Sequence, residues 1–294
     1  MPTGSVAFPG PVSPLLTLSP LRRGFGDPCF RVVDGVIWRT SLMHSGPVTA
    51  RISSTRTVAE CEAWGPGADE FLDGLPALLG ADDDASDFHP VEPTIAKAHE
   101  RVPHLRLGRT GRVLEALIPA IIEQRVAGKD AFRGWRLLVT KFGAPAPGPA
   151  PAGMRVPPTA EVWRRIPSWE FHRANIDPGR ARTIVGCAQR ADALERCRSA
   201  AGFRSMPGVG EWTAAETMQR AFGDADAISV GDYHLSNMVG MTLLGYRIDD
   251  AAMVELLEPL RPHRQRAVRL LEASGLARNP RFGARQAIPD LKSL

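Results

Sequence analysis

The feature that most constrains this chain is a glycine-rich turn between two helical patterns, Met206-Pro207-Gly208-Val209-Gly210-Glu211-Trp212-Thr213-Ala214. Gly208 and Gly210 flank one apolar residue, Val209, and allow a chain reversal tight enough to join two packed helices. The second helix is predicted to begin near Glu211, so that its first backbone N–H groups face outward. Because helix starts preceded by glycines bind anions, this stretch predicts a helical hairpin with an anion site at its turn.

Charge is unevenly distributed along the 294 residues. Residues 1–104 carry 8 lysines and arginines against 13 acidic residues, whereas residues 105–294 carry 28 against 19. The first part therefore has a net charge of −5 and the second a net charge of +9, within an overall +4. We expect any polyanion to be bound by the later two-thirds of the chain.

The cysteines and the apolar runs limit the class of protein. Cys29, Cys61, Cys187 and Cys197 form no Cys-x-x-Cys pair and match no zinc or iron–sulfur spacing, so we expect free thiols and no iron–sulfur cluster. Prolines interrupt the N-terminal apolar residues, and no run approaches the roughly 18 residues of a membrane span. The sequence predicts a soluble cytoplasmic monomer without a membrane partner, nucleoid-associated if it is bacterial.

Residues 1–92 are predicted to form an α+β domain. The alternation from Phe30 to Trp38 predicts two short strands around an Asp34-Gly35 turn. A further strand is expected from Pro47 to Ser53, and a short amphipathic helix from Ala68 to Leu79.

From about Pro93 onward the pattern is helical. Apolar residues recur with helical spacing from Val113 to Ile122, although Pro119 lies inside this run and is expected to bend the helix. The run of prolines, glycines and alanines from 143 to 153 predicts an exposed loop without regular hydrogen bonding.

Two charged features are expected at the surface. The acidic run Asp82-Asp83-Asp84 is predicted to lie in a solvated loop. A closing helix from Pro262 to Leu271 is predicted to turn Ala267, Leu270 and Leu271 inward and Arg264, Arg266 and Arg269 outward.

An aspartate, Asp232, follows Trp212 by twenty positions. With the hairpin at 206–214, this residue makes the chain resemble the helix-hairpin-helix DNA glycosylases, and within them 3-methyladenine DNA glycosylase II. The resemblance also includes the helix end Ile121-Ile122-Glu123-Gln124 and the turn Asp177-Pro178-Gly179-Arg180-Ala181-Arg182. It covers about residues 25–272 and is strongest over 206–235.

The resemblance implies an α+β fold that is mainly helical. It places an N-terminal antiparallel sheet domain at residues 1–92, beside a two-lobed helical core. One lobe, 113–226, would contain the hairpin, and the other, built from 93–112 and 227–294, would carry the catalytic aspartate, with a cleft between them.

The resemblance also implies the chemistry, which is base release from duplex DNA in base excision repair. Cleavage of an N-glycosidic bond builds positive charge on the sugar, and a fixed carboxylate such as Asp232 stabilises that charge and orients water. In bifunctional members a lysine at the position of Trp212 forms a Schiff base with the sugar. Tryptophan cannot do so, and no lysine lies between Lys141 and Lys292. We therefore expect a monofunctional glycosylase for damaged, alkylated bases that requires no cofactor and has no lyase activity.

The damaged base must leave the duplex stack to be reached. Trp212, Tyr233 and Trp38 are the candidates for the aromatic walls of a base pocket. Gln124 and Arg125 lie where the family keeps the residue that fills the gap in the duplex. A leucine is typical there, so Arg125 is a departure from the pattern.

The hairpin is expected to hold the DNA backbone through Gly208, Val209, Gly210 and Thr213. The family often binds a monovalent cation, Na⁺ or K⁺, on backbone carbonyls of the hairpin, which here would belong to Met206 and Val209. Glu211 departs from the pattern by placing a negative charge at the helix start.

Two alternatives stay open. The first is a glycosylase of the same fold for a neutral lesion such as hypoxanthine or uracil, which would need help from His234 or Tyr233 because such bases leave poorly. The second is a non-catalytic helix-hairpin-helix DNA-binding protein. A panel of single-lesion duplexes, with an Asp232→Asn variant, distinguishes them.

Overall fold

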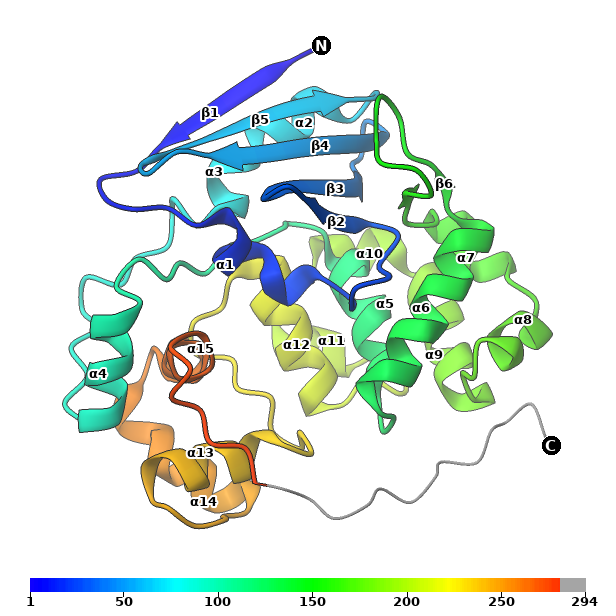
Figure 1. The fold of residues 1–294 in the computed structure, drawn as a ribbon. Helices are drawn as coiled ribbons and strands as arrows, with labels where there is room; N and C mark the ends of the chain where they lie inside the picture. The colour runs from blue at the N-terminus through cyan, green and yellow to red at the C-terminus, as the bar shows by residue number, and fades with distance from the viewer. Residues whose placement is uncertain (281–294) are drawn as a thin grey trace.

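A five-stranded antiparallel sheet forms one side of the computed structural model, which describes residues 1–280 (Figure 1). Its strands are β1 (Thr3–Ala7), β2 (Phe30–Val33), β3 (Val36–Leu42), β4 (Pro47–Ser54) and β5 (Val58–Trp64), in the order β1-β5-β4-β3-β2. Asp34 and Gly35 join β2 to β3 with φ values of 51° and 78°, as the predicted two-residue turn requires. The patterns used above predicted β2, β3 and β4 but not the outer pair β1 and β5.

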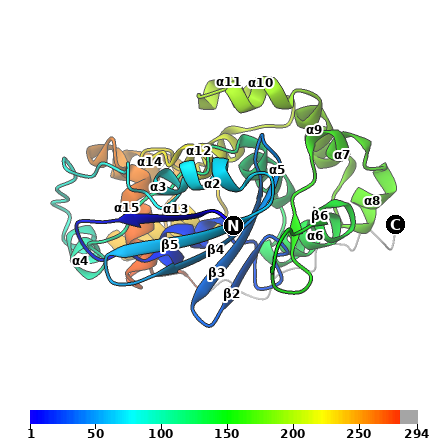
Figure 2. The ribbon, with the colours of Figure 1, turned by 90° about the horizontal axis from the view of Figure 1, so that it is seen from above.

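One face of the sheet is apolar because side chains alternate along each strand. Ile37, Ile52 and Cys61 share this face, since their backbones are paired across β3, β4 and β5. The face packs against α1 (Pro14–Leu18), the 3₁₀ turn η1 (Ser19–Leu21), α2 (Ala68–Asp73) and α3 (Leu75–Leu78). Figure 2 shows α2 and α3 beside the sheet. The helix expected over Ala68 to Leu79 is therefore present as two short helices, divided at Gly74.

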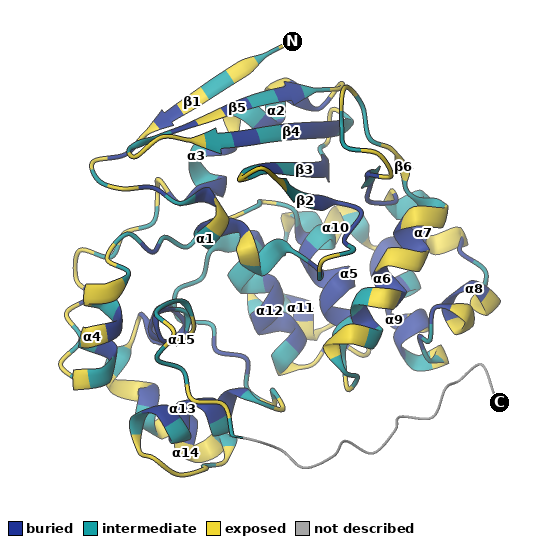
Figure 3. Cartoon of the chain, viewed as in Figure 1, coloured by how far each residue is buried: buried dark blue, intermediate teal, exposed yellow. Residues whose placement is uncertain are grey.

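The lobe that carries the hairpin is entirely helical except for one small ladder. Its helices are α5 (Val113–Glu123), α6 (Gly128–Phe142), α7 (Ala160–Arg165), α8 (Ser168–Arg173), α9 (Pro178–Gln189), α10 (Ala191–Arg196), α11 (Ala200–Arg204) and α12 (Glu211–Phe222). Helix α5 is buried without interruption from Ala116 to Ile122 and forms the centre of this lobe (Figure 3). Pro119 is accommodated inside α5. The proline-rich loop is more ordered than expected, because β6 (Ala144–Pro145) pairs with β7 (Arg155–Val156) at its base.

The second group of helices combines segments from distant parts of the chain. It contains α4 (Pro93–Arg101), α13 (Leu235–Leu243), α14 (Asp250–Leu257), the 3₁₀ turn η2 (Glu258–Leu260) and α15 (Arg264–Ala273). Helices α4 and α15 lie side by side around a shared apolar cluster, and α13 and α14 pack in a second cluster next to it (Figure 1). The last part of the expected 227–294 segment, residues 281–294, lies outside the described residues.

The predicted outward orientation of two α15 arginines, Arg264 and Arg266, is wrong, whereas Arg269 is partly exposed and pairs with Glu272. Arg264 and Arg266 are buried, with exposed fractions of 7% and 2%. Arg266 donates to both carboxylate oxygens of Asp83, at 2.9 and 2.5 Å, and Arg264 pairs with Asp226 at 2.6 Å. The acidic run is accordingly not a purely solvated loop, because Asp83 is buried against α15. Because each of these arginines is paired with a carboxylate, α15 can be buried on both of its faces.

The expected α+β class with a mainly helical core is confirmed. All four cysteines are free thiols, as expected, and burial raises the pKa of Cys61 and of Cys187 to about 12. Among the helices of residues 1–280, none is long and apolar enough to cross a membrane.

Candidate active site at the helical hairpin

The hairpin turn depends on glycine at position 208. Gly208 has a φ of 86°, and a Cβ atom there would lie 2.0 Å from Oγ1 of Thr183 on α9. Val209 closes the turn by donating its N–H to the carbonyl of Met206 at 3.0 Å. The side chains of Met206 and Val209 are buried in the core of the lobe. The turn is therefore anchored by its apolar residues and exposes its glycines.

Gln124 fastens the hairpin to the end of α5. Its Nε2 donates to the carbonyl of Gly208 at 3.0 Å and to Oγ1 of Thr213 at 2.7 Å. Thr213 is only 2% exposed. The Thr213 hydroxyl is therefore turned into the lobe, where it accepts from Gln124, and a contact of Thr213 with DNA stays a prediction that concerns its backbone N–H. Val209 donates its amide to Met206 within the turn, whereas the backbone N–H of Thr213 belongs to the uncapped first turn of α12.

A buried arginine, Arg180, connects the end of α5 to the start of α9. Arg180 donates to the carbonyl of Ile122 at 2.6 Å and to that of Asn175 at 3.1 Å, and it pairs with Asp177 at the start of α9. Burial acts to raise the pKa of Asp177, but the hydrogen bonds from Arg180 outweigh it and hold this pKa below its ordinary value. The resemblance included this turn, and the structure shows that its role is to hold α9 against α5.

The start of α12 is open. Gly210 is its N-cap residue, and no side chain caps the helix there. Gly210 is exposed, and a Cβ atom added to it would meet nothing within 4 Å. Glu211 is also exposed. An uncapped helix start with exposed glycine on its surface has the geometry to bind an anion through backbone N–H groups.

Arg125 occupies the turn between α5 and α6. It is exposed and has a φ of 54°, in the left-handed region that a residue with a Cβ seldom adopts. Such backbone strain costs about 1–3 kcal/mol and concentrates at functional sites. The predicted gap-filling residue therefore projects from a turn held in place by the neighbouring Gln124.

Asp232 is bound on both carboxylate oxygens. Oδ2 accepts the indole N–H of Trp212 at 3.1 Å. Oδ1 accepts the backbone N–H groups of His234 at 2.8 Å and Leu235 at 3.0 Å, at the start of α13. Asp232 thus caps α13 and at the same time contacts the hairpin helix. These three N–H donors hold the partly buried carboxylate of Asp232 in one orientation.

One face of α12 holds the whole segment that leads to Asp232. Trp212, Glu216 and Gln219 follow one another at helical spacing, so their side chains lie in one row. Glu216 accepts from Ser229 Oγ at 2.6 Å, and Gln219 donates to Ser229 Oγ at 2.9 Å and to the carbonyl of Ala227 at 2.8 Å. Sequence reasoning missed Glu216 and Gln219, although two polar residues in a row with Trp212 are a detectable signal.

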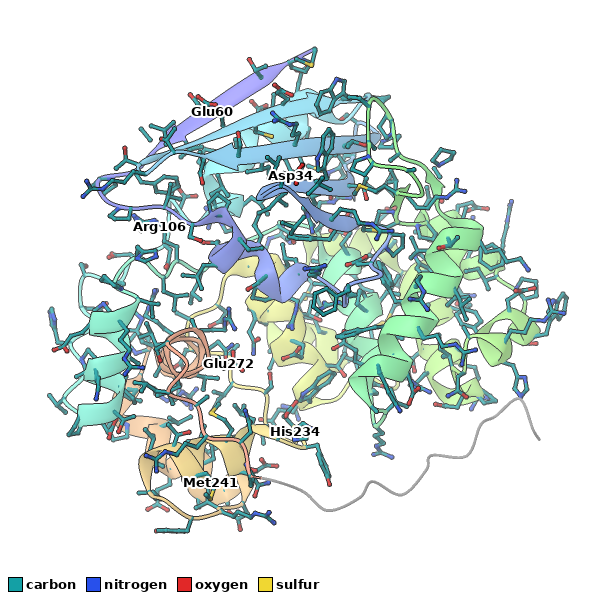
Figure 4. All side chains as sticks on the ribbon, in the orientation of Figure 1. Asp34, Glu60, Arg106, His234, Met241 and Glu272 are labelled. Atoms are coloured by element: carbon teal, nitrogen blue, oxygen red, sulfur yellow. The ribbon has the colours of Figure 1, made fainter. Side chains whose placement is uncertain are left out.

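The other two aromatic candidates differ in position. Tyr233 is adjacent to Asp232, is 69% exposed, and packs edge-on against His234 with ring centroids 4.8 Å apart. Trp38 is not part of this cluster. Its neighbours Ile37 and Arg39 face the helices, so Trp38 points to the opposite face of the sheet, where it stacks on Trp64 at 5.7 Å. Figure 4 shows Asp34, in the turn before this strand, and His234 on different sides of the molecule.

No protein-family profile matches the sequence, and no curated relative is found by sequence comparison. Solved structures with the same fold do exist. One is a 3-methyladenine DNA-glycosylase from Archaeoglobus fulgidus, with a TM-score of 0.75 and 16% identity over 92% of this chain and 98% of that one. Another is MBOgg1 with a low-affinity DNA ligand, with a TM-score of 0.73 and 14% identity over 93% and 95%.

A third is the Clostridium acetobutylicum 8-oxoguanine glycosylase/lyase bound to double-stranded DNA with cytosine opposite 8-oxoguanine. It has a TM-score of 0.68 and 13% identity over 90% of this chain and 92% of that one. Identities this low show a shared fold, and the fold extends over nearly the whole length of each protein.

Proposed function

We propose that this protein, whose fold is that of the helix-hairpin-helix DNA glycosylases, hydrolyses the N-glycosidic bond of damaged bases in duplex DNA. The observation that carries the proposal is Asp232, which is held by three N–H donors next to an open helix start. The uncapped start of α12 is suited to bind a phosphate, and the Asp232 carboxylate is suited to stabilise a sugar cation. The hydrogen bond between Trp212, in the first turn of α12, and Asp232 supports a joint role.

Asp232 would act on the sugar. As the glycosidic bond breaks, positive charge develops on the sugar ring, and a preorganised carboxylate stabilises it without having to reorient. The same carboxylate can orient the attacking water. The indole N–H of Trp212 and the two amides of α13 keep the carboxylate in place through this step.

The hairpin would act on the backbone of the DNA. The amides of Gly208 and Gly210 are our candidates for phosphate donors, with Arg125 entering the gap left by the base. We retain a Na⁺ or K⁺ ion on the carbonyls of Met206 and Val209 as part of this proposal. The Met206 carbonyl fits that role in part, since it accepts one hydrogen bond from Val209 and has a second lone pair.

We also propose that the enzyme lacks lyase activity. Covalent catalysis on the sugar requires an amine, and Trp212, not a lysine, is the residue in contact with Asp232. A solved protein of this fold is described as a glycosylase/lyase, so the fold accommodates both chemistries and the side chain at this position would decide between them.

For the substrate we propose alkylated bases. Bases made cationic by alkylation are good leaving groups, so they need no strong general acid near the glycosidic nitrogen. The aromatic groups next to Asp232, Trp212 and Tyr233, suit electron-poor bases. We further propose that the protein is cytoplasmic and acts on DNA as a monomer. Light scattering of the free and DNA-bound protein measures its oligomeric state.

The decisive experiment compares wild type with Asp232→Asn on duplexes that each carry one lesion. Asparagine keeps the shape but lacks the negative charge, so we expect base release to fall by about 100-fold or more. Binding to DNA with an abasic-site analogue should be retained. Wild-type product strands should break only after alkali treatment, because hydrolysis leaves an intact abasic site.

Two results would count against the proposal. Wild type and Asp232→Asn that bind DNA equally but release no base from any lesion would identify a non-catalytic DNA-binding protein. Strand cleavage by wild type without alkali would show lyase activity.

A further inference from the structure

The residue before Asp232 is held by a hydrogen bond and not by packing. Gly231 is exposed and has a φ of 87°, and a Cβ atom added to it would meet nothing within 4 Å. Glycine has more conformational freedom than any other residue, so an exposed glycine needs a polar contact to keep one conformation. The Gly231 N–H has such a contact, because it donates to Oδ2 of Asp250 at 3.0 Å.

Asp250 reaches out of its own helix to make this contact. It is the first residue of α14, where the helix dipole favours a carboxylate. The cap of α14 comes from the preceding residue, Asp249, whose Oδ1 accepts the N–H of Ala252 at 2.9 Å. Two adjacent aspartates therefore have different partners. Asp249 completes α14, whereas Asp250 bonds a segment 19 residues away in the sequence.

The two oxygens of Asp250 are in different environments. Oδ2 accepts from Gly231, whereas Oδ1 is buried and has no hydrogen-bond partner among residues 1–280. A buried carboxylate oxygen without a donor is unfavourable, and a carboxylate that served only solubility would turn both oxygens to water. The orientation of Asp250 is therefore explained by its bond to Gly231.

Helix α14 gives Asp250 a fixed base. Met253 and Leu257 of α14 are fully buried in an apolar cluster that they share with Met238 and Val239 of α13. The two helices lie side by side in Figure 1. A side chain in the first turn of a packed helix has a defined position, so Asp250 connects the segment before Asp232 to the packed part of the second group of helices.

Asp232 is thus held from three helices. The first amides of α13 bind its Oδ1, Trp212 of α12 binds its Oδ2, and α14 holds the preceding residue through Asp250. A carboxylate that stabilises a developing sugar cation must keep its position, and a misplacement of about 1 Å can slow an enzymatic step by about 100-fold. Without the bond to Asp250, Gly231 can change its conformation and shift Asp232 relative to the sugar.

We propose that Asp250 is a positioning residue for Asp232. Its carboxylate fixes the conformation of Gly231 and thereby the placement of the Asp232 carboxylate against the sugar. Asp250 acts through Asp232 and touches no reacting atom. The inference rests on the proposed glycosylase function and adds to it a residue from outside the hairpin.

The test uses the full-length protein in single-turnover release of an alkylated base, 7-methylguanine or 3-methyladenine, from a duplex, with the protein concentration varied up to saturation. Asp250→Ala removes the acceptor of the Gly231 N–H, and Asp250→Asn keeps an acceptor oxygen but removes the charge. The matched control is Asp249→Ala, which removes the adjacent carboxylate from the start of the same helix. Binding to DNA with an abasic-site analogue and denaturant unfolding are measured for each variant.

We expect Asp250→Ala to lower the rate constant at saturation by about 10- to 100-fold. The protein concentration that gives half of this rate, and the affinity for abasic-site DNA, should not change, because the lost contact serves the transition state. Asp250→Asn should stay within about 3-fold of wild type, since its side-chain oxygen still accepts from Gly231 and a neutral acceptor is only moderately weaker. Asp249→Ala should unfold at a lower denaturant concentration but release base at the wild-type rate.

A second comparison separates positioning from a general structural defect. In the Asp232→Asn background, Asp250→Ala should slow base release no further, because the carboxylate that it positions is already absent. An equal fold-loss in both backgrounds would show that Asp250 acts independently of Asp232 and would overturn the proposal.

Other outcomes overturn the role of Asp250 while the glycosylase proposal stands. They are a wild-type rate for Asp250→Ala, a rate for Asp250→Asn as low as that of Asp250→Ala, and an equal loss of rate in Asp249→Ala. Weakened abasic-site binding by Asp250→Ala, in parallel with its loss of rate, would likewise indicate a structural role. A wild type that releases no base from any duplex overturns the proposed function itself, and with it this inference.

Discussion

Asp232 receives a different kind of support on each of its oxygens. The backbone N–H groups at the start of α13 hold Oδ1, as they would for any helix-capping aspartate. The indole of Trp212 holds Oδ2 and comes from a different helix. A capping role and a catalytic role are therefore compatible in one carboxylate, because the cap leaves Oδ2 to be positioned by the hairpin helix.

This division leads to a prediction for Trp212→Phe. Phenylalanine keeps an aromatic wall but removes the N–H donor, so Asp232 loses a hydrogen bond to a charged group and with it a fixed position. We expect single-turnover base release to slow by about 10- to 100-fold, which corresponds to roughly 1.5–3 kcal/mol. Binding to abasic-site DNA should stay at the wild-type level.

Trp169→Phe is the matched control, since Trp169 is 61% exposed on α8 and remote in sequence from the site. If Trp212→Phe retained the full rate, the indole N–H would be shown to have no role in catalysis, and the function of Trp212 would be limited to its aromatic surface.

Among secondary-structure elements, the hairpin is defined by one steric requirement. Gly208 combines a positive φ with close approach to Thr183 on α9, whereas Gly210 has an ordinary φ of −90° and open space around it. The two glycines look equivalent in the sequence, but the structure makes only the first one obligatory.

We therefore predict opposite results for two similar substitutions. Gly208→Ala should lower the free energy of unfolding by at least about 2 kcal/mol and weaken DNA binding, because the new methyl group displaces the turn from α9. Gly210→Ala keeps the backbone N–H and meets no neighbour, so it should leave both quantities near wild type. Denaturant unfolding and binding titrations at several salt concentrations measure the two effects. Equal stability of the two variants would contradict this account of the turn.

For the molecule as a whole, buried ion pairs join segments that are far apart in the sequence. Asp83 lies after α3 in the N-terminal part of the chain, and Arg266 lies on α15 near the other end of the described chain. Their side chains are 7% and 3% exposed. This buried pair joins the acidic N-terminal part of the chain to the basic C-terminal part.

Arg266→Met should destabilise the protein by about 3–5 kcal/mol, because it leaves Asp83 charged and buried without a partner. The double variant Asp83→Asn with Arg266→Met should cost less than the sum of the two single substitutions. Denaturant unfolding of all four proteins gives this coupling directly. The matched control is Arg109→Met, which breaks a pair with Asp82 that is 50% exposed on both sides and should cost about 1 kcal/mol or less. Strict additivity of the two changes would show that the pair does not couple.

Several features were predictable because they depend on residues close together in the chain. The β2–β3 turn follows from Asp34 and Gly35, and the hairpin follows from its glycines. Asp232 was singled out in a different way, through the resemblance of residues 206–235 to the helix-hairpin-helix DNA glycosylases. The burial of Arg266 was not predictable in this way, because its partner lies 183 residues away.

The sequence by itself determined the local conformations, namely which residues turn, cap and form amphipathic helices, because these depend on backbone preferences over a few positions. The tertiary structure decided which polar groups meet. It paired Thr213 with Gln124, turned Trp38 toward Trp64 and away from the site, and buried Arg266 against Asp83. Each of these outcomes depends on how distant segments pack around α5, α12 and α15, and no short stretch of sequence contains that information.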